Sequence, residues 1–185
     1  MMTINDFGAP ISEITYEFTP DDLKALIGGT YDAQNLSKTA VSGAYPSLNW
    51  SSVATLIEGK ESTSAVSATS PKDNIKRLKF DAGFDNFVFA ITPEEGWIVE
   101  SFNLNSKRAN EVYKLHATIG GEDLAKALNL SVSTSDTAYK RDNANNVAGP
   151  LSFTYTRQPA ENSTGNGVFY INSLTVTLKK QELQQ

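Results

Sequence analysis

Aromatic residues in the irregular parts of the sequence are the first candidates for chemistry. An aromatic ring presents a flat apolar face, and neighbouring polar groups can fix the hydroxyls of a ligand, which is the combination that binds sugars. The candidate ligand-binding residues stand beside Asn, Asp and Arg in segments without a clear strand pattern, and they are Trp50, Tyr45, Tyr31, Tyr139 and Arg141. Trp50 is the first choice among them. The alternative is that Trp50 packs in the core, because a lone tryptophan is buried more often than not.

Oxygen-bearing side chains crowd the segment before the last two expected strands. The candidate metal ligands are Asp136, Asp142, Asn143 and Asn145. Carboxylate, amide and carbonyl oxygens are the ligands that Ca²⁺ prefers in proteins, so the segment is a weak calcium candidate. The spacing does not match the D-x-[DN]-x-[DN]-G loop, and Asp and Asn are also ordinary turn residues.

Catalytic side chains are sparse. His116 is the one histidine of the sequence, and it falls in the middle of an expected strand, where we interpret it as a plain strand residue. A Ser-His-Asp triad and most zinc sites need a histidine. The sequence contains no G-x-S-x-G motif, and its two Gly-Gly pairs lack the spacing of a phosphate loop. No catalytic residue is therefore assigned.

Paired carboxylates leave one enzymatic alternative open. A glycoside hydrolase needs two carboxyl groups that face each other across a substrate. The pairs Asp21-Asp22 and Glu94-Glu95 are adjacent in sequence, and adjacent residues seldom converge on one substrate. Asp21 and Asp22 also suit the first turn of a helix, where negative charge is favoured. We therefore expect a protein that is not an enzyme, with a carboxylate-dependent glycoside hydrolase as a remaining alternative.

The amino-acid composition limits the classes of binding partner that we expect. The 185 residues carry a formal net charge of −5 and contain no cysteine, which excludes disulfides and thiolate metal sites. The negative charge disfavours nucleic acid and anionic membranes, and no apolar run approaches the length of a membrane span. The first residues lack a basic region followed by an apolar one. Either the chain is not exported or the sequence begins at the mature chain, and the abundance of Ser, Thr and Asn favours the second.

Two-residue alternation predicts the fold. The clearest strand is 167–178, where Leu174, Val176 and Leu178 alternate with threonines and Phe169 and Ile171 alternate on the opposite parity. This change of phase predicts a β-bulge at Asn172-Ser173 that lets Ile171 and Leu174 both face the core.

Further strands are expected across most of the chain. Strand patterns cover 12–19, 75–80, 86–92, 97–104, 111–119 and 151–156, with weaker patterns at 53–57 and 128–132. Pro20 after Thr19 predicts a short helix over 20–27, and 122–129 is expected to add a helical turn or two. Segments 58–72 and 136–149 read as polar loops, and 1–10 as a loose N-terminal segment. The prediction is an all-β, antiparallel two-sheet jelly-roll sandwich with one or two short helices, forming one domain over 1–185.

A family resemblance accompanies this pattern. Residues 97–104, the basic turn 106–108 and the strand 113–118 resemble the middle of bacterial extracellular jelly-roll domains of the galactose-binding-like type. Residues 168–176 are similar to the final strand of those domains, with Asn172 where Asp is common. The resemblance covers the C-terminal half and carries over no catalytic residue. It implies a secreted or surface domain that binds, frequently to glycans.

These observations predict a non-catalytic binding or adhesion module that is carbohydrate-directed and secreted or at the cell surface. The expected partner is a glycan or a surface protein, without nucleic acid or membrane insertion, and an oligomer is compatible with it. No cofactor is expected beyond the calcium candidate. The first alternative is a structural assembly protein, such as a virion, tail or surface-layer subunit, and the second is the glycoside hydrolase.

Overall fold

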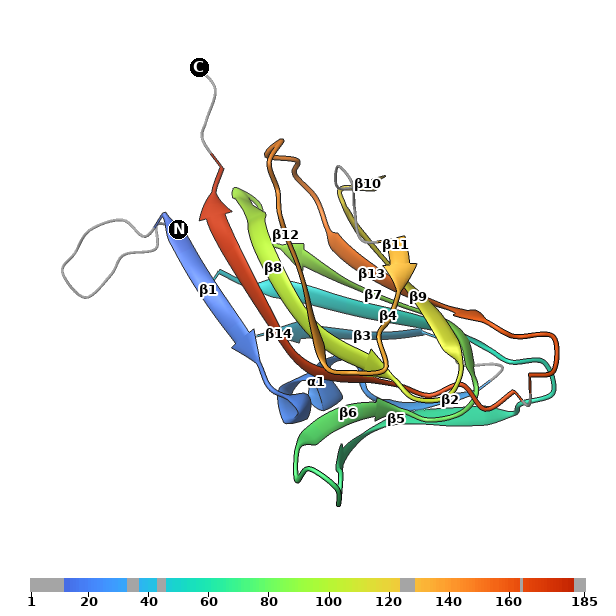
Figure 1. Ribbon diagram of the computed structural model, residues 1–185. Coiled ribbons are helices and arrows are strands. Elements are labelled where there is room, and N and C mark those ends of the chain that lie inside the picture. Colours follow the sequence, from blue (N-terminus) through green and yellow to red (C-terminus); the bar gives the residue numbers. More distant parts are fainter. Residues whose placement is uncertain (1–11, 33–36, 43–45, 124–128, 164, 182–185) are drawn as a thin grey trace.

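Two antiparallel sheets of seven strands each face one another in the computed structural model (Figure 1). The structure describes residues 12–32, 37–42, 46–123, 129–163 and 165–181. The first sheet, called the β14 sheet here, has the order β12 (Thr137–Asp142), β8 (Trp97–Arg108), β14 (Phe169–Lys180), β6 (Lys76–Phe80), β5 (Ser62–Thr69) and β2 (Gly29–Asp32), with β1 (Glu13–Phe18) also paired to β14.

The second sheet, called the β13 sheet, has the order β10 (Glu122–Asp123), β9 (Val112–Ile119), β13 (Leu151–Gln158), β7 (Phe84–Pro93), β4 (Leu48–Leu56) and β3 (Ser37–Ser42), with β11 (Asn129–Ser131) also paired to β9. From β7 to β9, and again from β12 to β14, consecutive long strands lie in alternate sheets. The chain is a two-sheet antiparallel jelly-roll sandwich, as the alternation predicts.

Strand β14 runs through the middle of its sheet. It pairs with β8 over most of its length, while its other side pairs first with β6 and then with β1. The register with β8 shifts between Ile171 and Ser173, and both Ile171 and Leu174 are fully buried. The predicted bulge is therefore confirmed, and it keeps two apolar side chains in the core on either side of the phase change.

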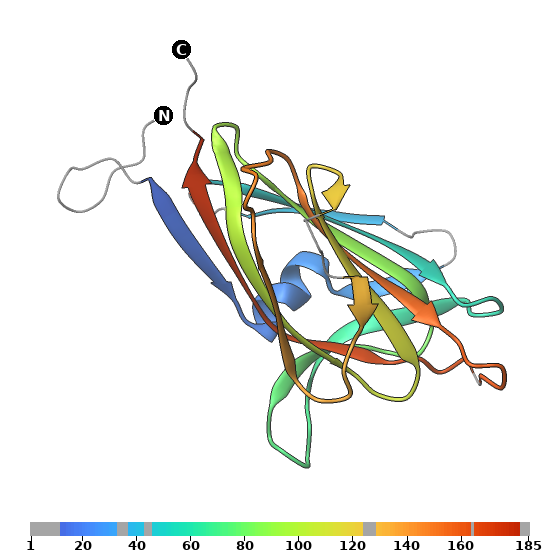
Figure 2. The same ribbon diagram turned by 45° about the horizontal axis from the view of Figure 1, so that its top comes forward.

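The described residues contain one helix, α1 (Pro20–Ile27), as the sequence predicts. The hydroxyl of Thr19 accepts from the N–H of Asp22, and the Asp22 carboxylate accepts from the N–H of Thr19, which forms a capping box. Leu23 and Ile27 are buried, and α1 contacts strands of both sheets and lies between them (Figure 2). No helix among the described residues is long and apolar enough to cross a membrane.

Stacked aromatic rings join the two sheets in the core. Phe80 and Phe169 of the β14 sheet stack with ring centroids 4.3 Å apart, and Phe169 stacks on Tyr155 of the β13 sheet at 4.2 Å. The Tyr155 hydroxyl donates to Ser106, which in turn donates to the carbonyl of Tyr170. Such close packing holds the central strands rigid, so outward side chains on β8 and β14 have fixed starting positions.

Several expected loops are strands. Segment 58–72 contains β5, and segment 136–149 contains β12, an edge strand paired with β8. Both strands carry mostly small or polar residues, with one fully or nearly buried apolar side chain facing the core, Ala65 in β5 and Tyr139 in β12. Their alternation is consequently faint, and tertiary pairing rather than local propensity makes them strands. The expected loose segment 1–10 lies outside the described residues, as does most of the expected second helix.

Candidate functional site on the outer face of the β14 sheet

A row of polar side chains covers the outside of the β14 sheet. Because successive residues of a strand point to opposite faces, β8 directs Phe102 and Leu104 into the core and their neighbours outward. The outward residues of β8 and their partners on β14 form what we call the polar strip, namely Ser101 with Thr177, Asn103 with Thr175, Asn105 with Ser173, and Lys107 with Tyr170. The strip spans seven residues of β8, from Ser101 to Lys107, and is roughly 20 Å long.

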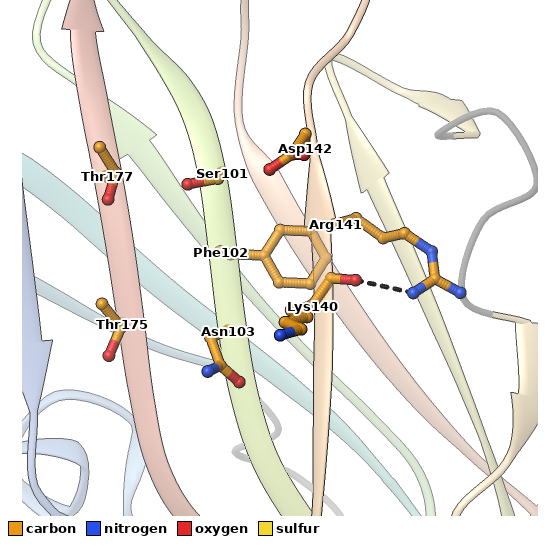
Figure 3. A pocket seen from close by; sticks show the side chains of 8 residues that line it. All are labelled: Ser101, Phe102, Asn103, Lys140, Arg141, Asp142, Thr175 and Thr177. Atoms are coloured by element: carbon orange, nitrogen blue, oxygen red, sulfur yellow. Dashed lines mark hydrogen bonds between the residues drawn. The ribbon is translucent and has the colours of Figure 1, made fainter.

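One end of the strip is hollowed. The first hollow has a volume of about 470 Å³ and is lined by Ser101, Phe102, Asn103, Lys140, Arg141, Asp142, Thr175 and Thr177. Figure 3 shows Ser101 and Thr177 side by side at one level and Asn103 and Thr175 at the next. The edge strand β12 adds a wall, because Asp142 pairs with Ser101 and Lys140 pairs with Asn103. Three adjacent strands therefore bring hydroxyl, amide, ammonium and carboxylate groups together.

Asn103 holds an unused hydrogen-bond acceptor in this hollow. Its Oδ1 atom is buried and has no hydrogen-bond partner within the described residues. An unpaired buried acceptor costs about 1–3 kcal/mol, so native proteins rarely keep one. Asn105, one pair along the strip, is satisfied, since its Nδ2 donates to Ser173 Oγ at 3.1 Å. Lys140 is exposed and lies beside Asn103 in Figure 3.

Two carboxylates meet beyond the first hollow. Glu100 follows Val99 on β8 at a second register irregularity, and it shares a hydrogen bond with Glu13 of β1. This hydrogen bond, followed by burial and the charge of Glu13, raises the pKa of Glu100 above its ordinary value. Two carboxyl groups in direct contact leave no room for a sugar between them, unlike the carboxylate pair of a glycosidase, which is separated by about 5–10 Å.

The opposite end of the strip has a second hollow. It has a volume of about 210 Å³ and is lined by Ala68, Thr69, Ser70, Pro71, Arg77, Lys79, Lys107 and Tyr170. Arg77 is buried and ion-paired to Asp73 and Asp136, which fixes the 70–75 turn and the start of β12 against β6. Tyr170 is the aromatic residue of the strip and is half exposed.

The predicted aromatic platforms are core residues. Trp50 is fully buried and packs edge-on against Phe18 at 4.8 Å, Tyr31 donates to the carbonyl of Ile27, and Tyr139 is 5% exposed. Their rings offer no face to a ligand, because alternation along β4, β2 and β12 points them inward. This corrects the expectation for Trp50, Tyr31 and Tyr139. Tyr45 lies outside the described residues.

Arg141 is one of the residues that line the first hollow. Its Nη1 donates to the carbonyl of Lys140 at 2.7 Å, and Figure 3 shows the guanidinium pointing away from β8.

The residues that sequence reasoning missed are the small polar ones of β8 and β14. Their alternation with Phe102, Leu104 and Val176 was visible in the sequence, but nothing local indicated that β12 would pair beside them.

The four candidate calcium ligands do not converge. Asp136 and Asp142 stand at opposite ends of β12, about 20 Å apart along the strand. Asp136 is held by Arg77, and the amide of Asn143 donates to the carbonyls of Val99 and Val147. Asn145 is exposed in the following turn. No group of three or more His, Cys, Asp or Glu side chains suited to a metal occurs in the described part of the chain.

No protein-family model and no curated protein matches the sequence. Solved structures show a distant likeness. A family two carbohydrate esterase from Cellvibrio japonicus is 8% identical with a TM-score of 0.37, over 84% of this chain and 37% of the esterase chain, so this chain spans little more than a third of that structure's length.

Two carbohydrate-binding modules are also similar. TmCBM61, solved with β-1,4-galactotriose, is 11% identical with a TM-score of 0.39 over 78% of this chain and 88% of its own. CBM36, solved with calcium and xylotriose, is 13% identical with a TM-score of 0.30 over 80% of this chain and 98% of its own. At these scores the likeness carries no functional argument.

Proposed function

We propose that this protein is a non-catalytic carbohydrate-binding module that holds a glycan along the polar strip. The observation that carries the proposal is the first hollow, where side chains from β12, β8 and β14 gather on the outside of a rigid sheet. Sugars expose many hydroxyls, each of which can both donate and accept a hydrogen bond, and the hollow offers matching groups. Because the strands fix these groups in advance, binding loses little conformational entropy.

Asn103 supports the proposal most directly. Its unpartnered Oδ1 lies among Lys140, Thr175 and Ser101, where a ligand hydroxyl would supply the missing donor. The gain on binding is then larger than for a group that already has a partner, because binding removes a desolvation penalty that the free protein carries.

A binding role without catalysis fits the distribution of reactive groups. His116 lies on β9 in the other sheet, and Glu13 and Glu100 contact each other instead of facing across a groove. A secreted or cell-surface location agrees with a glycan ligand and belongs to the same proposal.

A glycan array followed by titration calorimetry tests the proposal. For the glycans that bind, the double variant Asn103→Ala/Thr175→Ala should weaken binding about tenfold or more, since two hydrogen bonds contribute about 0.5–1.5 kcal/mol each. The matched control is Thr154→Ala on β13, an outward threonine of the other sheet, which should bind like the wild type. An array without a hit, or equal losses in both variants, would overturn the proposal.

A further inference from the structure

We propose that the second hollow binds the anionic group of an acidic sugar, so that the glycan held by the strip carries a carboxylate or a sulfate ester. This inference rests on the proposed function and names the class of its ligand. The feature that carries it is a cross-strand row in which Tyr170 pairs with Lys107 of β8 on one side and with Lys79 of β6 on the other.

The geometry of the row places two ammonium groups around one ring. Directly paired residues on adjacent strands have Cβ atoms about 4.5–5.5 Å apart. The Nζ atom of Lys107 lies 5.4 Å from the centroid of the Tyr170 ring, within cation–π range. The two lysines therefore flank a half-exposed aromatic face, and all three side chains line the hollow.

The ammonium groups of the row are only weakly ion-paired, although Asp73, Asp81 and Asp136 equal Arg77, Lys79 and Lys107 in number. Within the described residues, no carboxylate is in ion-pair contact with Lys107. Lys79 is 3.6 Å from an oxygen of Asp81, but both side chains are substantially exposed, so the pair is weak. The third cation, Arg77, is already paired to Asp73 and Asp136 and serves as the wall of the hollow. In a chain of net charge −5, two such lysines on one face mark a local site for an anion.

An oxyanion fits this arrangement better than a neutral group. Placed between the two lysines, it would accept charge-assisted hydrogen bonds from both and relieve their mutual repulsion. It would also draw Lys107 off the ring, which frees the face of Tyr170 to stack on the sugar that carries the anion. The polar strip connects this hollow with the first one, so one oligosaccharide can place an acidic unit here and neutral hydroxyls at Asn103.

The test compares two pairs of ligands, and the members of each pair share a backbone and differ mainly in charge. Titration calorimetry would measure the affinity of the protein for four ligands, at low and at physiological salt. The ligands are tetragalacturonate, its methyl ester, the neutral β-1,4-galactotetraose and a sulfated galactotetraose. We expect the acidic ligands to bind about tenfold more tightly than the methyl ester, with a preference that decreases as salt rises. Comparing the carboxylated and the sulfated ligand shows which oxyanion the second hollow binds. Tighter binding of either one than of its neutral counterpart supports the proposal.

Lysine variants locate the effect. Lys79→Gln/Lys107→Gln should remove the preference for the acidic ligands, so that they bind no more tightly than the methyl ester. The control Lys114→Gln/Lys60→Gln changes the net charge equally at exposed or partly exposed positions outside the strip and should preserve the preference. Equal binding of charged and neutral ligands would overturn this inference while the proposed function stands. If no ligand binds in this panel or on the array, both proposals fail.

Discussion

The two outer faces of the sandwich arise from the same alternation but carry different residues. On the β13 sheet, the outward residues of β4, β7 and β13 are uncharged, while the neighbouring strand β9 adds Lys114 and His116. The uncharged residues are Asn49, Ser51, Val53, Thr55, Asn86, Val88, Ala90, Thr92, Ser152, Thr154 and Thr156. Threonine and valine suit strands, and Val53, Val88 and Thr154 form one cross-strand row. Most of this face carries residues that suit a sheet, with Asn49 and Asn86 as exceptions.

The outer face of the β14 sheet departs from that pattern. Its strip and its β12 wall use Asn103, Asn105, Lys107, Lys140 and Asp142, residue types that are depleted in strands. One of them also keeps an unpaired buried oxygen. A local choice that lowers stability without a structural gain points to function. The comparison therefore favours the β14 sheet as the binding face.

The surface formed by β4, β7 and β13 is relevant to the assembly alternative. A structural subunit would use such a face to contact another copy, and light scattering after size exclusion would then find a stable symmetric oligomer. A monomer that binds glycans would leave this face as ordinary solvated surface.

The largest expected change in stability comes from substituting Trp50, which tests whether this residue belongs to the core or to the binding face. Trp50→Ala should lower the free energy of unfolding by about 3–5 kcal/mol, because it opens a cavity under the β13 sheet. Trp50→Phe should cost far less, since Nε1 has no hydrogen-bond partner within the described residues. Denaturant titration measures both variants. If Trp50→Ala kept its full stability but lost glycan binding, Trp50 would instead belong to the ligand site.

A smaller loss is expected from Arg77→Met. The substitution leaves Asp73 and Asp136 beside each other without their cation. We expect a loss of about 2 kcal/mol, below the value for a fully buried pair because both carboxylates reach solvent. Denaturant titration gives the loss, and calorimetry with an acidic ligand should show weaker binding as the wall of the second hollow loosens. An unchanged midpoint would contradict this structural role.

Reciprocal substitutions would make the two faces alike. Asn103→Thr should stabilise the protein by about 0.5–1 kcal/mol, since it removes an unpaired acceptor and adds a β-branched residue, and it should weaken glycan binding. Thr154→Asn on the other face should destabilise by a similar amount and leave binding intact. Thermal unfolding measures the stability of the two variants, and calorimetry measures their glycan binding. A destabilising Asn103→Thr would remove the argument from the stability cost.

The smallest effects concern pH, because the groups involved are exposed. Hydrogen bonds from Arg77 and from the N–H of Ile75 lower the pKa of Asp73 from 3.8 to about 2. Its contribution to stability is therefore present above about pH 4 and disappears as the pH falls to about 2. The pKa of Glu100 is raised above its ordinary value of 4.5. Below pH 4.5 the protonated carboxyl group therefore stabilises the folded protein. This contribution disappears as the pH rises through the raised pKa.

Melting temperatures against pH for three proteins check these signs. Relative to the wild type, Asp73→Asn should flatten the acid limb below pH 4, and Glu100→Gln should remove the decline that begins near pH 4.5. Identical profiles for the three proteins would contradict both assignments.

Much of the framework was predictable because it depends on neighbours in sequence. Thr19 and Asp22 are three residues apart and cap α1 by themselves, and the parity change at Asn172-Ser173 is visible without any partner strand. The site was less predictable. Arg141 and Asp142 were candidates for other reasons, while Asn103 and Tyr170 drew no attention because small polar residues and tyrosine are ordinary on a strand.

The sequence by itself determined the sandwich, its one described helix and the bulge, since two-residue alternation and capping act over a few residues. The tertiary structure alone decided that Trp50 and Tyr139 are core residues, that β12 pairs beside β8, and that Lys107, Tyr170 and Lys79 share a row. The physical reason is that strand pairing joins residues far apart in the chain. Which side chains become neighbours on a face is therefore fixed by the assembled sheet and not by local sequence.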